Sequence, residues 1–269
     1  MKYVILIILL TVCASSQETP SSSSPANSSP QAIPTDQENS SKARAILDEA
    51  IRALGGSAYL NIKDMATEGR SYSFHRGQPN SVGTVFWRFR KFPDKDRIEL
   101  TKKRDVVEIY NGDKGYEVTF RGVHNVDDKD QLQPYLRLRH FALDVVLRQW
   151  LNTPGVALFY EGQTVAAQKE TDQITVMNAK NEGVTLYIDS NTRLPVKKTF
   201  TWRDPTDKQR NVEEEIFDNY RPVQGVMTPF DTTRLFNGEM SAQFFLTNVS
   251  YNRNLDDALF DPTASAKRR

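Results

Sequence analysis

The chain has few of the residues on which disulfides, metal sites and nucleic-acid binding depend. Cys13 is the only cysteine, which excludes an intramolecular disulfide and every zinc site built on several cysteines. The 35 basic side chains are matched by 34 acidic ones, for a formal net charge of +1. A nucleic-acid binder needs a clustered excess of Lys and Arg to neutralise phosphates, so we expect no nucleic-acid partner.

Sequence motifs of the common catalytic sites are also absent. The sequence contains no Gly-x-Ser-x-Gly elbow, no Gly-rich phosphate-binding loop, no dinucleotide-binding fingerprint and no His-Glu-x-x-His helix. The three histidines, His75, His124 and His140, fall in separate predicted elements without the spacing of a metal site. We therefore expect no metal, no cofactor, no catalytic residue and no enzymatic activity.

The first 14 residues have the layout of a secretory signal. Lys2 precedes an unbroken apolar run from Tyr3 to Leu10, and short side chains follow. A transmembrane helix needs about 20 apolar residues, so this run is too short to span a membrane. We expect the protein to be exported to the bacterial periplasm.

Two processing routes fit the end of this signal. Val12 and Ala14 occupy the −3 and −1 positions of a signal-peptidase site, which would remove residues 1–14. Alternatively, residues 10–13 resemble a bacterial lipobox, in which Cys13 is acylated and tethers the protein to a membrane. Val12 departs from the small residue that a lipobox carries before its cysteine. Both routes stay open at this point.

Residues 15–41 are dominated by Ser, Pro and Asn, with Ile33 as the only sizeable apolar side chain. Such a stretch cannot offset its ordering entropy by burial, so we predict a disordered linker. A folded domain is expected over residues 42–262, with a short tail over residues 263–269. The domain opens with a helix that Ser40 or Ser41 caps and that ends at Gly55. Its apolar side chains recur at helical spacing, namely Ile46, Leu47, Ala50, Ile51 and Leu54.

The rest of the domain alternates apolar and polar residues with a period of two, first over residues 62–126 and again over residues 156–251. Between these stretches, a helix begins near Pro134 and ends before Pro154, and most of its circumference is apolar. The turns are short, so consecutive strands pair antiparallel. Sheets of about eleven or twelve strands curl or close. We therefore predict an α+β fold: one large curved antiparallel sheet, an incomplete β-barrel, with two or three helices on its concave side.

Two polar patterns are candidates for a catalytic or ligand-binding site. His140 and Asp144 lie one helical turn apart, which suits an oriented base, but a stripe in which Asp144 bridges His140 and Arg148 is the favoured interpretation. The run from Glu213 to Glu215 alternates faces along a strand, so its carboxylates do not converge, and we expect a charged edge or a solvent face.

Aromatic residues make up 10% of the chain, and many alternate along predicted strands. A curved sheet with too few helices to cover its concave face leaves an apolar cavity. For any single aromatic residue, an ordinary core position is the competing interpretation. We expect Trp87 and Phe89 to point inward together with Val85. The proposed ligand-binding wall consists of Trp87, Phe89, Tyr116, Phe120, Leu186, Phe200, Trp202 and Phe245.

Several short passages resemble one known family, the periplasmic lipoprotein-carrier superfamily of outer-membrane lipoprotein-sorting proteins, which are LolA-like or LolB-like. These passages are residues 53–56, 60–65, 186–189 with 193–197, and 218–220 with 225–229. The resemblance implies an incomplete antiparallel barrel, closed by helices, that holds the acyl chains of lipids or lipoproteins. It assigns no functional residue to a numbered position.

Three functions follow in order of preference. The first is a non-enzymatic envelope protein, a monomer, that binds acyl chains of lipids or lipoproteins in a carrier, sorting or sensor role. The second is a structural or assembly-factor lipoprotein that binds another envelope protein and needs no cavity. The third is an exported hydrolase, which a carboxylate cluster or a histidine pair in a cleft would support.

Overall fold

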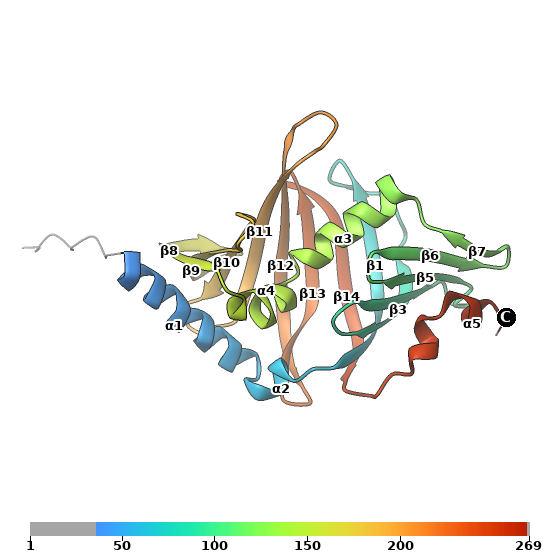
Figure 1. Cartoon of the computed structure of the whole chain (residues 1–269), viewed down its shortest axis with the longest axis horizontal. Helices are drawn as coiled ribbons and strands as arrows, with labels where there is room; N and C mark the ends of the chain where they lie inside the picture. The colour runs from blue at the N-terminus through green and yellow to red at the C-terminus, as the bar shows by residue number, and fades with distance from the viewer. Residues whose placement is uncertain (1–35, 268–269) are drawn as a thin grey trace, which may run out of the picture. The chain divides into compact units, whose positions relative to one another are not determined.

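The computed structural model describes residues 36–267, and one antiparallel sheet of 14 strands dominates it (Figure 1). The hydrogen-bonded order is β7-β6-β5-β4-β3-β1-β14-β13-β12-β11-β10-β9-β8, with β2 paired to β1 alone. The sheet is curved and open, which confirms the predicted half-barrel. The strands are β1 (Asp64–His75), β2 (Gln78–Pro79), β3 (Thr84–Lys91), β4 (Lys95–Leu100), β5 (Val106–Asn111), β6 (Lys114–Thr119), β7 (Gly122–Asn125), β8 (Ala157–Ala166), β9 (Lys169–Met177), β10 (Gly183–Asp189), β11 (Pro195–Arg203), β12 (Arg210–Val223), β13 (Val226–Phe236) and β14 (Glu239–Tyr251).

The sheet has two more strands than the upper end of the sequence expectation. Its two shortest strands, β2 and β7, have two and four residues. Segments of this length are too short to produce a visible alternation of apolar and polar residues, so sequence patterning misses them.

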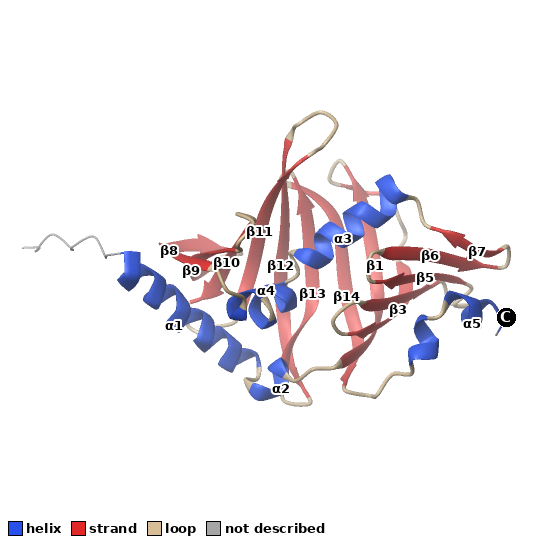
Figure 2. Ribbon diagram, viewed as in Figure 1, coloured by secondary structure: helices blue, strands red, loops and turns tan. Residues whose placement is uncertain are grey.

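Five α-helices complete the described fold, and α1, α3 and α4 lie on the concave side of the sheet (Figure 2). They are α1 (Asp36–Leu54), α2 (Ser57–Leu60), α3 (Gln133–His140), α4 (Leu143–Arg148) and α5 (Pro262–Lys267). A π-helical turn (Asp128–Leu132) precedes α3, and 3₁₀ turns occur at Trp150–Asn152 and Asp257–Phe260.

The position of α3 and α4 follows from the strand order. β7 and β8 are consecutive along the chain, yet they form the two opposite edges of the sheet. The segment between them must therefore cross the half-barrel, and it does so as α3 and α4. The topology thus places a helical cover over the concave face.

Helix α1 begins earlier than the sequence pattern predicted. It starts at Asp36, so residues 36–41, which we assigned to the disordered linker, are helical. Asp36 and Glu38 lie in the first turn, where negative charge complements the helix dipole. The Asn39 side-chain amide donates to the Tyr160 carbonyl oxygen on β8 and accepts from the Tyr160 N–H, at 2.8 Å each. The rest of the expected linker and signal, including Cys13, lies outside the described residues.

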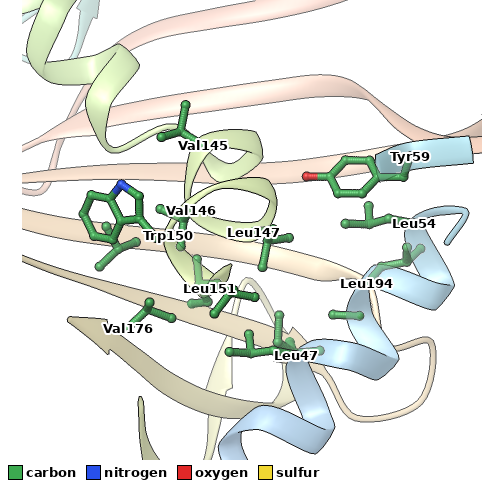
Figure 3. Close-up of a cluster of buried hydrophobic side chains, with 14 of the residues drawn as sticks. Leu47, Leu54, Tyr59, Val145, Val146, Leu147, Trp150, Leu151, Val176 and Leu194 are labelled. Atoms are coloured by element: carbon green, nitrogen blue, oxygen red, sulfur yellow. The ribbon is translucent and has the colours of Figure 1, made fainter. Parts of the chain in front are cut away.

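The main hydrophobic core lies between the helices and the β8–β12 half of the sheet (Figure 3). Leu47 of α1 and Leu147 of α4 are fully buried there against Ile174 and Leu186. A smaller core lies on the other half, where Phe260 packs against β5 and β6. The C-terminal segment thus covers part of the sheet, and the expected tail over residues 263–269 is helical as far as Lys267.

The helix predicted between Pro134 and Pro154 is broken into two. Phe141 ends α3, and Ala142 is extended, with φ −66° and ψ 145°. The Lys198 ammonium, which is 1% exposed, donates to the Phe141 carbonyl oxygen at 2.7 Å. This buried cation replaces the next helical hydrogen bond, which explains why the apolar periodicity alone did not reveal the break.

Candidate functional site

A cavity of about 470 Å³ lies between α3, α4 and the central strands of the sheet. This volume falls within the range of about 300–1,000 Å³ that is typical of ligand pockets. Helix α2 and residues Leu143, Asp144 and Arg148 of α4 border one end, and strands β1, β3–β5 and β12–β14 supply the wall. Because α3 contributes Tyr135, Leu138 and Arg139, the cover crossing the sheet forms one side of the cavity.

The cavity runs along β1 from Met65 to Ser71, both of which line it. Six residue steps of a strand span about 20 Å. At the Met65 end the lining side chains of Leu54, Tyr59 and Ile62 are buried, although Met65 itself is half-buried; we call this more enclosed end the closed end. At the Ser71 end the lining side chains are only half-buried, so this end is the more open one. These are Ser71, Leu100, Thr232, Arg234, Phe244 and Leu246.

Much of the wall is apolar. Phe86 and Phe244 meet edge to face, with ring centroids 6.2 Å apart. The apolar lining side chains include Leu54, Ile62, Met65, Phe86, Ile98, Leu100, Leu138, Leu143, Phe217, Val226, Phe244 and Leu246. Such a wall favours an apolar ligand of corresponding length.

Charged side chains also reach the cavity, and most are paired. Arg88 binds Asp96 through Nε at 3.0 and 3.1 Å, and Tyr135 donates to the same carboxylate at 3.0 Å. Arg90 binds Asp144 at 3.0 Å. These pairs link the sheet to α3 and α4, so they hold the cover in place.

Glu215 and Glu108 show how the surroundings tune buried carboxyl groups. Burial alone would raise the pKa of Glu215, but Lys198 at 3.1 Å and Arg234 at 2.7 Å outweigh it and lower the pKa to about 2. Burial raises the pKa of Glu108, although a hydrogen bond from Tyr110 opposes the shift. Glu215 is therefore a fixed negative charge in the wall, whereas Glu108 is more readily protonated.

Comparison with known proteins bears on this architecture. No protein-family model and no curated protein sequence matches the chain. Solved structures do match: a DUF1329 family protein from Desulfovibrio piger has a TM-score of 0.58 at 13% identity, over 82% of this chain and 98% of that one. An outer membrane lipoprotein-sorting protein domain from Vibrio parahaemolyticus has a TM-score of 0.57 at 10% identity, over 83% and 97%. A LolA superfamily protein from Nitrosomonas europaea has a TM-score of 0.50 at 11% identity, over 81% of this chain and 97% of that one.

The protein has the LolA-like fold. At identities this low the likeness concerns the fold, and the functional residues must be read from this chain itself. No helix among residues 36–267 has the length and apolar character required to cross a membrane.

Within this LolA-like fold, none of the eight side chains expected to form the wall lines the cavity. On β3 the cavity is lined by Phe86, Arg88 and Arg90, so Trp87 and Phe89 point to the opposite, convex face. Phe89 packs there beside the smaller core. The prediction that Val85, Trp87 and Phe89 point inward is therefore wrong. The side chains of β3 alternate as predicted, but it is the other set that faces the cavity. The two arginines on the inner face made it look like the solvent side.

The remaining candidates are dispersed. Tyr116 pairs with Ile109 in the register of β5 and β6 and shares the convex face with it, Phe120 is 87% exposed in a turn, and Phe245 is 38% exposed beside Tyr72.

Leu186 and Phe200 do face the helices. However, both are buried in the main core, where Phe200 stacks on Phe141 with centroids 4.3 Å apart. Trp202 lies under the Arg137 guanidinium at 3.5 Å, on the far side of α3.

The two polar patterns also differ from expectation. Asp144 binds Arg90 instead of bridging His140 and Arg148, and His140 Nε2 lies 2.8 Å from Glu182. Glu215 is buried instead of lying on a solvent face, because Lys198 and Arg234 neutralise it.

A second hollow of about 1,090 Å³ lies on the opposite face of α3 from the cavity, and His140 and Glu182 line it with Trp202. His140 Nε2 and Glu182 Oε2 are hydrogen-bonded at 2.8 Å, and the His140 ring lies 4.8 Å from Phe141 and 5.1 Å from Trp150 between centroids. Among the described residues, no group of three or more His, Cys, Asp or Glu is placed to hold a metal ion. The hydrogen bond between His140 and Glu182 joins α3 to the loop before β10.

Proposed function

We propose that this protein is a non-enzymatic envelope protein that holds an acyl chain in the cavity beneath α3 and α4, in a carrier, sorting or sensor role. The observation that carries the proposal is the cavity itself: about 470 Å³, walled largely by apolar side chains and roughly 20 Å long. One leaflet of a bilayer core, which a single acyl chain spans, is about 15 Å thick. The cavity is therefore long enough to hold such a chain.

Two further features support the proposal. The N-terminal pattern is that of an exported protein, and the lipoprotein-sorting domain from Vibrio parahaemolyticus shares the fold. A partner-binding assembly factor would need no cavity, so the cavity favours the carrier role. Whether residues 1–14 are removed or Cys13 is acylated decides between a free periplasmic carrier and a tethered one, and Cys13→Ser with labelled palmitate separates these routes.

A larger side chain on one strand of the wall tests whether the cavity holds the ligand. Leu246 lines the cavity, and its neighbour Phe245 points to the convex face. Leu246→Trp is expected to abolish most uptake of a fluorescent fatty acid, because the added ring occupies the lumen. Phe245→Trp adds similar bulk outside and is the matched control, with uptake unchanged.

Native mass spectrometry of protein purified from envelope membranes gives an independent readout. We expect co-purifying lipid with the wild type and with Phe245→Trp, and none with Leu246→Trp. Absence of lipid and of fatty-acid uptake in the wild type would refute the proposed function.

A further inference from the structure

Two polar atoms at the closed end of the cavity are buried and make no hydrogen bond within the described residues. They are Oη of Tyr59, in α2, and Nε of Arg148, in α4. Both side chains line the cavity, and Tyr59 is only 7% exposed. A buried donor without a partner costs about 1–3 kcal/mol, so such atoms in native proteins require an explanation, and an absent ligand is one.

The two side chains belong to one neighbourhood. The Arg148 guanidinium donates from Nη2 to the backbone carbonyls of Leu60 and Ile62, which lie one and three residues after Tyr59 in the sequence. The Tyr59 hydroxyl points toward α4 (Figure 3). Two separate elements thus bring unused hydrogen-bond capacity to the same end of an otherwise apolar cavity.

The charge at the cavity favours an anion. Five arginines and only three carboxylates line it, a surplus of two positive charges. Including Asp96, which binds Arg88, and Lys198, which binds Glu215, leaves this surplus unchanged. Asp144 also faces Tyr59, but Arg90 neutralises it at 3.0 Å.

Protonation supports the same choice. Burial raises the pKa of Tyr59 well above its ordinary value, so the hydroxyl keeps its proton and serves as a donor. Arginine stays charged at all physiological pH values. An O–H donor beside an N–H donor of a cation suits a carboxylate, which accepts at both oxygens.

We infer that the cavity binds a long-chain fatty acid head-first, with its carboxylate held by Tyr59 Oη and Arg148 Nε and its chain extending along β1 toward Ser71. This inference rests on the proposed function and specifies its ligand. The half-buried apolar side chains at the Ser71 end, such as Leu100 and Phe244, then cover the tail.

The test compares palmitate with hexadecanol, which has the same chain and no charge, by displacement of a fluorescent fatty alcohol from the purified protein. We expect the wild type to bind palmitate at least about tenfold more tightly than hexadecanol, because the carboxylate accepts charge-assisted hydrogen bonds that an alcohol does not. Tyr59→Phe should remove most of that preference and leave hexadecanol binding within about twofold. A lysophospholipid with the same chain should bind no more tightly than hexadecanol.

Stability separates this role from a structural one. Because the Tyr59 hydroxyl has no partner within residues 36–267, Tyr59→Phe should keep or raise the free energy of unfolding of the unliganded protein. Tyr160→Phe is the matched control: Tyr160 does not line the cavity and its hydroxyl donates to Asp172 Oδ1 at 3.0 Å, so its loss should lower stability and leave the palmitate preference intact.

The outcomes distinguish the two proposals. Equal binding of palmitate and hexadecanol by the wild type, or an unchanged preference in Tyr59→Phe, overturns the head-first orientation while the carrier function stands. Tighter binding of the lysophospholipid than of palmitate also overturns it, since the head would then lie at the open end. If neither palmitate nor hexadecanol binds, the proposed function and this inference fail together.

Discussion

At the scale of single residues, the buried ion pairs of the cavity wall link stability to pH. Glu215 has a pKa of about 2 in the folded protein against an ordinary 4.5. Because the pKa of Glu215 is lower in the folded than in the unfolded protein, its ionisation stabilises the fold fully above about pH 4.5. This contribution to the free energy of unfolding disappears as the pH falls toward 2. The shift corresponds to about 3 kcal/mol.

Glu215→Gln removes this dependence. At neutral pH it should destabilise the protein by about 3–5 kcal/mol, because Lys198 and Arg234 remain buried beside a neutral group. The difference in free energy of unfolding between wild type and variant should become smaller as the pH falls from about 6 to about 3. Urea unfolding at several pH values measures this difference. A difference that stays constant or grows in acid would show that Glu215 is not the group responsible for the pH dependence.

The aromatic residues once expected to share one wall should respond differently to truncation. Phe200 is 3% exposed and stacks on Phe141, so Phe200→Ala should cost about 3–5 kcal/mol, as in a packed core. Trp87 is half-buried on the convex face, where Arg104 lies over its ring at 4.4 Å, so Trp87→Ala should cost about 1 kcal/mol. Neither change should alter fatty-acid binding by the folded fraction. Equal losses of stability, measured by denaturant unfolding, would contradict these placements.

At the scale of elements, the two helices of the cover differ in how they are held. Helix α4 buries Val145, Val146 and Leu147, whereas α3 has no fully buried side chain. The contacts of α3 are mainly polar, such as Tyr135 with Asp96 and His140 with Glu182. An element with few buried apolar contacts opens at low free energy. Helix α3 is therefore the more weakly attached part of the cover.

Hydrogen exchange should report this difference directly. The amides of α3 are expected to exchange well before those of α4, and bound palmitate should protect α3 more than α4, because Leu138 and Tyr135 line the cavity. Leu186 in the core provides an internal reference that ligand should not affect. Equal protection of both helices without ligand would show that the cover moves as one unit.

At the scale of the whole molecule, the sequence was sufficient for the architecture and insufficient for the site. Alternation, short turns and one apolar helical segment predict a curved antiparallel sheet with helices inside it, as observed. Alternation separates two faces without saying which is inner. Arg88 and Arg90 made the inner face of β3 look solvated, because their partners Asp96 and Asp144 are distant in sequence or lie on another element.

The residues proposed to bind the carboxylate had little sequence signal. Tyr59 lies in a four-residue helix, and Arg148 belongs to a stripe interpreted as solvated. What marks them is that Tyr59 Oη and Arg148 Nε make no hydrogen bond within residues 36–267, a property that exists only after folding. A Tyr three residues after a helix-ending Gly-Gly pair and the last of three arginines in the predicted second helix were the only hints available.

The contact of Asn39 with β8 has a consequence for how the molecule avoids self-assembly. An open sheet exposes the backbone groups of its edge strands, which can template pairing with further chains. The Asn39 amide offers the same donor and acceptor as a neighbouring strand would, and it occupies both ladder positions of Tyr160. The start of α1 therefore acts as a one-residue strand mimic, which limits polymerisation through an edge that the half-barrel, to keep its cavity open, cannot close.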